Sequence, residues 1–177
     1  MKVKVYLDTN IIFGLFKNFI LRKNFIPWKI WFLRNNSNRI EAYTSSLAIS
    51  EAVSEIVKIA EKEKIKVSER DVDGIVKRLV EYCGVKILSK VEMSDLVLFT
   101  VHKIDVKDSL HLEISKRNNM ILITDDVELK ERGRYFYSKI MGFYEFVKMV
   151  LGPPRVELGS RPCKGRVLAD RLWTLEN

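Results

Sequence analysis

Short apolar runs alternate along the chain with longer stretches in which apolar residues recur every three or four positions. Val3 to Leu7 is a short β-branched run and Met120 to Thr124 is a strongly apolar run, both typical of buried strands. Residues 49–60 instead carry apolar side chains at helical spacing, which predicts an amphipathic helix. This alternation favours an α/β sandwich with a mostly parallel central sheet.

The remaining elements follow from the same pattern and from residues that start or stop helices. Ser45 or Ser46 is the predicted N-cap of the helix over residues 49–60, and Pro27 marks another helix start. The helix after Pro27 should place Trp28, Trp31 and Phe32 on one face. The other predicted elements are strands at Tyr43–Thr44 and Val85–Leu88, helices at Glu69–Tyr82 (stopped by Gly84), Met93–His102, Asp108–Arg117 and Phe143–Leu151, and a turn at Asn118–Asn119.

The length and composition indicate one compact domain. With 177 residues, the chain can bury a sizeable core without disulfides. We expect residues 1–151 to form this domain and residues 152–177, which begin with Gly-Pro-Pro, to form a loosely attached tail. No apolar run approaches the roughly 18 residues of a membrane span, and no signal-peptide pattern precedes the first strand. The expected location is therefore the cytoplasm, without membrane attachment.

Cysteine and histidine residues do not form a metal-binding pattern. Cys83 and Cys163 are isolated from each other, so we interpret both as free thiols in a reducing compartment. His102 and His111 are interpreted as packing or surface residues. There is no Ser/His/Asp or Cys/His arrangement and no glycine-rich phosphate loop, which argues against zinc and against nucleotide binding.

The positive charge is concentrated in one segment. The net charge is +8, and residues 11–40 contain six basic residues, seven aromatic residues and no acidic residue. Three interpretations remain open: a platform that stacks RNA bases, core packing with basic residues in solvent, or a groove for a partner helix or a second subunit. On the first interpretation, the RNA-binding residues are Lys17, Arg22, Lys23, Lys29, Arg34 and Arg39.

Acidic residues follow the predicted strands. Asp8 ends the first strand, Asp125 and Asp126 follow a late strand, Asp108 starts a helix, and Glu51 lies in the helix after the second strand. Parallel α/β sheets bind ligands at the carboxyl ends of their strands, so these carboxylates could converge. Because clustered carboxylates repel one another, a hard divalent cation such as Mg²⁺ would stabilise the cluster.

Each acidic residue also has a plainer interpretation. Asp8 could cap the following turn, and Glu51 could be a boundary residue of an amphipathic helix. Asp108 could be an N-cap, and Asp125 or Asp126 could be ordinary turn residues. Only the combined pattern favours a metal site.

Four short segments contain these acidic residues. They are Val5-Tyr6-Leu7-Asp8-Thr9-Asn10, Thr44-Ser45-Ser46-Leu47-Ala48-Ile49-Ser50-Glu51, Lys107-Asp108-Ser109-Leu110-His111-Leu112 and Ile121-Leu122-Ile123-Thr124-Asp125-Asp126. Together they resemble the PIN domain, in particular VapC-like toxins and related archaeal and bacterial nucleases. In order and spacing, the resemblance covers about residues 1 to 150. Two features depart from the family pattern: residues 17–39 are longer than in a minimal toxin, and Ser109 replaces the usual alanine.

The resemblance implies a three-layer sandwich, a function and a set of site residues. The activity would be endonucleolytic hydrolysis of RNA with Mg²⁺ or Mn²⁺, leaving 5′-phosphate and 3′-hydroxyl ends. A toxin would bind a small antitoxin protein, and homodimers are common in such families. By resemblance, the catalytic and metal-binding carboxylates are Asp8, Glu51, Asp108 and Asp126, with Asp125 as a helper and Thr9, Asn10 and Thr124 as orienting residues.

Two other functions remain as alternatives. The first is an RNA-binding or scaffold PIN domain without catalysis, against which the retained acids argue. The second is a phosphatase with an aspartate nucleophile, which usually carries Asp-x-Asp after the first strand. The chain has Asp8-Thr9-Asn10 at that place, so the second acid is missing.

Overall fold

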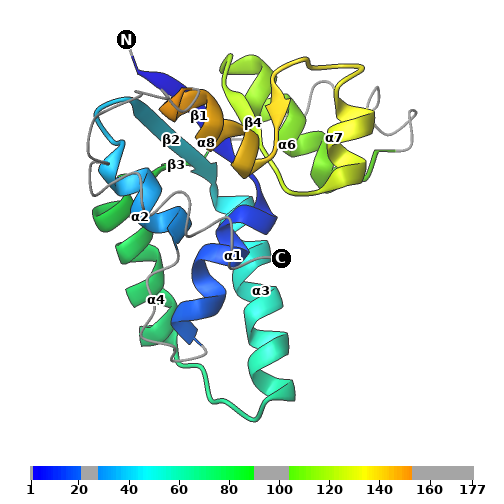
Figure 1. Ribbon diagram of the computed structural model, residues 1–177. Coiled ribbons are helices and arrows are strands. Elements are labelled where there is room, and N and C mark those ends of the chain that lie inside the picture. The colour runs from blue at the N-terminus through cyan, green and yellow to red at the C-terminus, as the bar shows by residue number, and fades with distance from the viewer. Residues whose placement is uncertain (1, 21–27, 90–103, 153–177) are drawn as a thin grey trace, which may run out of the picture.

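A parallel sheet forms the centre of the molecule. The computed structural model describes residues 2–20, 28–89 and 104–152 (Figure 1). Within these ranges the strand order is β3-β2-β1-β4-β5, and every strand pair is parallel. The strands are β1 (Val3–Leu7), β2 (Ile40–Ser45), β3 (Lys86–Leu88), β4 (Ile121–Ile123) and β5 (Ile140–Met141).

Helices connect the strands, mostly where the sequence predicts them. The strand β5 was not predicted, because two residues are too few to show a period of hydrophobicity. The predicted helix at Met93–His102 and the predicted tail from Pro153 onward lie outside the described residues. The helical elements are α1 (Thr9–Ile20), α2 (Trp28–Asn35), α3 (Ser46–Lys62), α4 (Glu69–Lys77) continued by the π-helical turn η1 (Arg78–Tyr82), α6 (Val106–Arg117), α7 (Val127–Gly133) and α8 (Phe143–Leu151).

Alternating strand residues create the three-layer arrangement. Val5 and Leu7 of β1 join one apolar cluster together with side chains of α1, α2, α3 and α8. Tyr6, between them, points to the other face and joins a second cluster with Leu112 of α6 and Leu129 of α7. Because successive side chains of a strand alternate between faces, the sheet is covered on both sides, which confirms the predicted α/β sandwich.

The aromatic residues before β2 mostly serve the core. Phe16 and Phe32 are buried, and Trp28 packs edge-on against Phe143 at a centroid distance of 5.3 Å. The prediction that Trp31 shares this face is wrong, since its exposed fraction is 48%. The buried face of α2 is formed by Ile30, Phe32 and Leu33 and is centred near Leu33, so Trp31 falls on the opposite side of the helix.

Sheet register brings the predicted site residues to one edge. Leu7 of β1 pairs with Ile123 of β4, so the residues that follow them, Asp8 and Thr124, are neighbours although far apart in the sequence. On the other side of β1, β2 ends at Ser45, which caps α3 by accepting a hydrogen bond from the backbone N–H of Ala48 at 3.1 Å. Within the described ranges, no helix is both long and apolar enough to cross a membrane.

Candidate active site

Asp8 is the most enclosed carboxylate at this sheet edge. Its exposed fraction is 3%, and its Oδ1 accepts the backbone N–H of Thr9 at 2.6 Å. Its Oδ2 accepts hydrogen bonds from the Asn10 amide at 3.0 Å and from the Thr124 hydroxyl at 2.7 Å. The structure thus brings Asn10 and Thr124 into hydrogen bonds with the Asp8 carboxylate, and their role in orienting it at a metal site stays a prediction.

Glu51 approaches the same place from α3. Its Oε2 accepts a hydrogen bond from the Thr9 hydroxyl at 2.6 Å, so Thr9 also has the expected orienting position. Its Oε1 is buried and has no hydrogen-bond partner, although the ammonium of Lys107 lies 3.3 Å away as an ion pair. A buried carboxylate oxygen without a hydrogen bond is costly, and it is a natural ligand for a cation.

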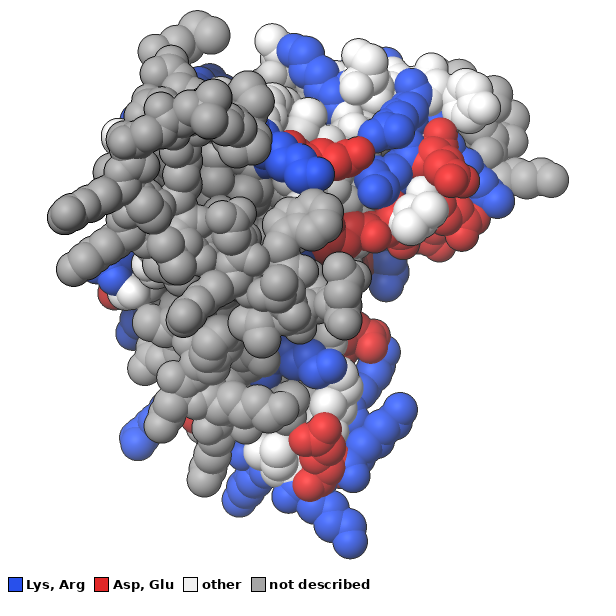
Figure 2. Space-filling model, in the orientation of Figure 1, with Lys and Arg blue, Asp and Glu red and all other residues white. Residues whose placement is uncertain are grey.

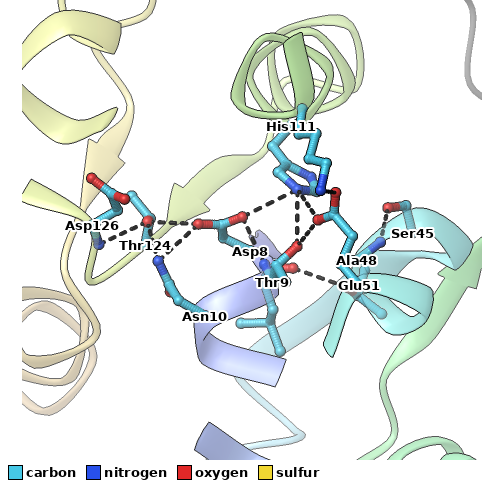
Figure 3. A network of polar contacts seen from close by, with 12 residues as sticks. Asp8, Thr9, Asn10, Ser45, Ala48, Glu51, His111, Thr124 and Asp126 are labelled. Carbon is cyan, nitrogen blue, oxygen red and sulfur yellow. Dashed lines mark hydrogen bonds and ion pairs between the residues drawn. The ribbon is translucent and has the colours of Figure 1, made fainter. Parts of the chain in front are cut away.

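His111 lies at the centre of the network, where the sequence analysis did not expect it. The ring is 1% exposed, and its Nε2 lies 3.0 Å from the Thr9 hydroxyl, 3.3 Å from Asp8 Oδ1 and 3.4 Å from Glu51 Oε2. Figure 3 shows the ring pointing from α6 toward these three side chains. The signal was its position three residues after Asp108, because helix residues at this spacing are neighbours.

The hydrogen bonds around His111 indicate an imidazolium. The Tyr6 hydroxyl donates to Ser45 Oγ at 2.7 Å, so its oxygen is left to accept from His111 Nδ1 at 2.9 Å. The Thr9 hydroxyl likewise uses its one proton for Glu51 and accepts from Nε2. Burial lowers the pKa of His111, but the hydrogen bond to Glu51 and the nearby carboxylates outweigh it and raise the pKa above its usual value.

This environment shifts the pKa values of Glu51 and Asp108 in opposite directions. Burial acts to raise the pKa of Glu51, but the polar contacts with His111, Thr9 and Lys107, together with the charge of His111, lower it to about 2. Burial, followed by the charges of Asp8 and Asp126, raises the pKa of Asp108 to about 6. Burial and two neighbouring carboxylates thus both disfavour the charged form of Asp108.

Asp108 and Asp126 differ in their local roles. Asp108 lies in the first turn of α6, whose N-cap is Asp105, which accepts the backbone N–H of Lys107 at 2.8 Å. The N-cap interpretation of Asp108 is therefore wrong. Asp126 is the N-cap of α7, where its Oδ1 accepts the backbone N–H of Leu129 at 2.9 Å. Its negative charge also contributes to the raised pKa of Asp108.

Asp125, the predicted helper, has other partners. Its Oδ1 accepts the backbone N–H of Phe143 at the start of α8 at 3.0 Å. Its Oδ2 forms an ion pair with Lys29 of α2 at 2.6 Å. Both oxygens therefore anchor neighbouring helices, and the structure does not bring this carboxylate into the network of Asp8, Glu51 and His111.

The oxygen-rich donor set suits a hard divalent cation, but it is not preassembled. In the described part of the chain, no group of three or more His, Cys, Asp or Glu lies close enough together to hold a metal ion as it stands. The free oxygen of Glu51 and the crowded charge of Asp108 both fit a cation at this edge. Binding would require Glu51 to exchange its ion pair with Lys107 for the metal.

Two of the predicted RNA-binding residues take part in packing. Lys29 pairs with Asp125 and also lies over the ring of Phe143. The guanidinium of Arg34 stacks 3.9 Å from the centroid of the Tyr82 ring. The core-packing interpretation of this segment therefore accounts for Lys29 and Arg34.

The other predicted basic residues remain untested as RNA ligands. Lys17 and Arg39 are exposed, whereas Arg22 and Lys23 lie outside the described residues. On the face shown in Figure 2, the Lys and Arg side chains of the described residues lie on several sides of a group of acidic side chains.

Comparison with known proteins identifies the family and similar solved structures. The model described as "PIN domain" matches residues 5–135, a range that includes all four predicted catalytic carboxylates. The crystal structure of PAE2754 from Pyrobaculum aerophilum has a TM-score of 0.57 at 14% identity, covering 85% of this chain and 98% of that one. A PilT N-terminus domain protein, SSO1118, from Sulfolobus solfataricus P2 has a TM-score of 0.45 at 13% identity, covering 85% and 96%. No curated protein matches the chain in the sequence comparison.

Proposed function

Because the chain belongs to the PIN-domain family, whose members are generally nucleases, we propose that it is a divalent-metal-dependent endoribonuclease. The observation that carries this proposal is the buried Asp8 carboxylate, held by three donors, beside a Glu51 oxygen, Oε1, that has no hydrogen bond. Among the described residues, the only compensation that Oε1 receives is an ion pair with the exposed Lys107, so a divalent cation would be a stronger partner for it.

The four acids have distinct roles in this proposal. Asp8 and Glu51 would hold the cation, Mg²⁺ or Mn²⁺, and Asp108 and Asp126 would complete its surroundings. When bound, such a cation activates water and stabilises the charge that develops on a phosphodiester. In the metal-free protein, burial and the charges of Asp8 and Asp126 raise the pKa of Asp108 to about 6, and a bound cation would favour its charged form.

His111 would position the carboxylates and not touch the substrate. It connects Thr9 at the start of α1, Tyr6 of β1 and Glu51 of α3 by contacts of 3.0, 2.9 and 3.4 Å. Because the ring is fully enclosed, it holds Glu51 and Asp8 in fixed relative positions even without metal.

RNA as the substrate is supported by the net charge of +8 and by the exposed Lys17 and Arg39. An antitoxin partner and a homodimer belong to the same proposal as expectations for a toxin. The phosphatase alternative loses support, because the place of its second acid is taken by Asn10. The amide of Asn10 donates hydrogen bonds to Asp8 Oδ2 and to Thr124 Oγ1.

The test is cleavage of end-labelled RNA, structured and unstructured, with single-stranded DNA of the same sequence. Each substrate is incubated with Mg²⁺, with Mn²⁺ and with EDTA. The variants are Asp8→Asn and, as a matched control, Asp73→Asn, an exposed acid on α4 that pairs with Lys77. We expect cleavage of RNA with either metal, abolished by EDTA and by Asp8→Asn but not by Asp73→Asn.

Two outcomes would contradict the proposal. Cleavage that persists in Asp8→Asn would mean that the activity belongs to another site or to a contaminant. Salt-sensitive RNA binding without cleavage of any substrate would favour the non-catalytic binding domain.

A further inference from the structure

Lys107 brings a solvent-facing cation to the carboxylate cluster. It immediately precedes Asp108 in the first turn of α6, and its ammonium lies 3.3 Å from Glu51 Oε1. The Lys107 side chain is 67% exposed, whereas the Glu51 side chain is 14% exposed. One end of this pair is therefore fixed in the site, while the other is a flexible arm that solvent can reach.

The two oxygens of Glu51 have different partners. Oε2 is held by the Thr9 hydroxyl at 2.6 Å and lies beside His111. Oε1 has no hydrogen bond, and Lys107 is the cation beside it. An exposed lysine compensates a buried carboxylate only weakly, so a divalent cation should displace it readily.

The displaced ammonium would still lie next to the metal site. Lys107 is attached one residue from Asp108, and its charge also reaches Glu55, one turn further along α3. Because Glu55 is already paired with Lys58 at 2.6 Å, a phosphate group of a substrate bound at the site could replace Glu51 as the partner of Lys107, and lysine binds phosphate well as a point charge.

We propose that Lys107 competes with the divalent cation for Glu51 Oε1 in the metal-free protein and, once released, binds a phosphate of the RNA. This inference rests on the proposed function, since it assumes that a cation binds Glu51. Lys107 would then have two partners in turn, first the carboxylate of Glu51 and then a phosphate of the substrate.

The first test measures Mn²⁺ binding by isothermal titration calorimetry at low salt. The variants are Lys107→Met, Lys107→Arg, which keeps the charge, and the control Lys116→Met, an exposed lysine at the other end of α6. Loss of a competing charge should tighten Mn²⁺ binding by Lys107→Met about 3- to 10-fold. Lys107→Arg and Lys116→Met should bind as the wild type does. Unchanged or weaker binding by Lys107→Met would overturn the inference.

The second test measures RNA affinity by fluorescence anisotropy, with Ca²⁺ as the cation and with EDTA. With Ca²⁺, Lys107→Met should weaken binding about 3- to 10-fold and reduce the slope of log affinity against log salt by roughly one phosphate contact. With EDTA, where Glu51 retains Lys107, the loss should be much smaller. An equal loss in both conditions would overturn the inference. If the wild type binds no Mn²⁺ at all, both the proposed function and this inference fail. If the wild type binds Mn²⁺ and Lys107→Met binds it with the same affinity, only this inference is refuted.

Discussion

The hydroxyl of Thr124 donates a 2.7 Å hydrogen bond to Oδ2 of Asp8, across a separation of 116 residues. The bond exists because β1 and β4 are neighbours in the sheet and end side by side. Thr124 also accepts hydrogen bonds from the Asn10 amide at 2.9 Å and from the backbone N–H of Asp126 at 3.1 Å. One hydroxyl therefore connects the first acidic motif to the last.

Replacing Thr124 by valine should weaken both the fold and the site. The change keeps the shape but leaves the Asn10 amide, the Asp126 N–H and an Asp8 oxygen without this partner. We expect a loss of about 1–3 kcal/mol in the free energy of unfolding, measured by urea denaturation. RNA cleavage should also fall, because Asp8 would no longer be held. Thr124→Ser retains the hydroxyl and should recover most of both properties, and equal losses in the two variants would contradict this role.

The pH dependence of metal-free stability should reflect Asp108. Its pKa in the folded protein is raised to about 6, so the folded state binds a proton more tightly than the unfolded state. Stability should therefore increase as pH falls from 7 through 6 and level off near pH 4. Below that, Glu51 acts in the opposite direction, because its pKa is lowered to about 2 and its protonation removes stability.

Asp108→Asn isolates this effect. At pH 7 without metal, it should stabilise the protein by about 1–2 kcal/mol, a value reduced for the partial exposure of Asp108. The increase in stability between pH 7 and 4 should become smaller in the variant. Thermal unfolding across this pH range in EDTA provides the measurement. Destabilisation of the metal-free protein at pH 7 would show that the Asp108 carboxylate is not repelled by its neighbours.

Removal of the buried His111 imidazole should lower the stability of the protein. His111→Ala leaves a cavity and removes the donor to Tyr6 and Thr9, so we expect a loss of about 2–4 kcal/mol in the free energy of unfolding. Addition of Mn²⁺ should restore part of that stability, since a cation would again lie between Asp8 and Glu51. A variant as stable as the wild type in EDTA would contradict the central position of His111.

Several parts of this arrangement could be read from the sequence, and others could not. The apolar runs ending at Asp8 and Asp126 predict the two strands, and their parallel pairing predicts that their ends meet. The position of His111 was missed because the side chains around its ring come from other parts of the chain, among them β1, α1 and α3. Only the tertiary structure shows that they converge on it. Residues 11–40 were ambiguous, because aromatic residues at helical spacing suit either a core or a base-stacking surface.

Asp125 is another residue whose role could not be predicted from the sequence. Two consecutive aspartates after a strand are equivalent by sequence, but the chain turns between them, so Asp125 anchors Lys29 and α8. Asp125→Ala should therefore lower the free energy of unfolding by about 1–2 kcal/mol and leave Mn²⁺ affinity within about twofold of the wild type. A large loss of Mn²⁺ affinity in calorimetry, with stability unchanged, would instead make Asp125 a metal ligand.

The most direct test of the proposed metal site is anomalous diffraction from crystals soaked in Mn²⁺. The account predicts an anomalous peak in contact with the carboxylates of Asp8 and Glu51, with the ammonium of Lys107 moved away from Glu51 Oε1. Crystals of Asp8→Asn soaked in the same way should lack this peak. A wild-type map without a peak at the carboxyl ends of β1 and β4, or with the ion bound elsewhere, would contradict the account.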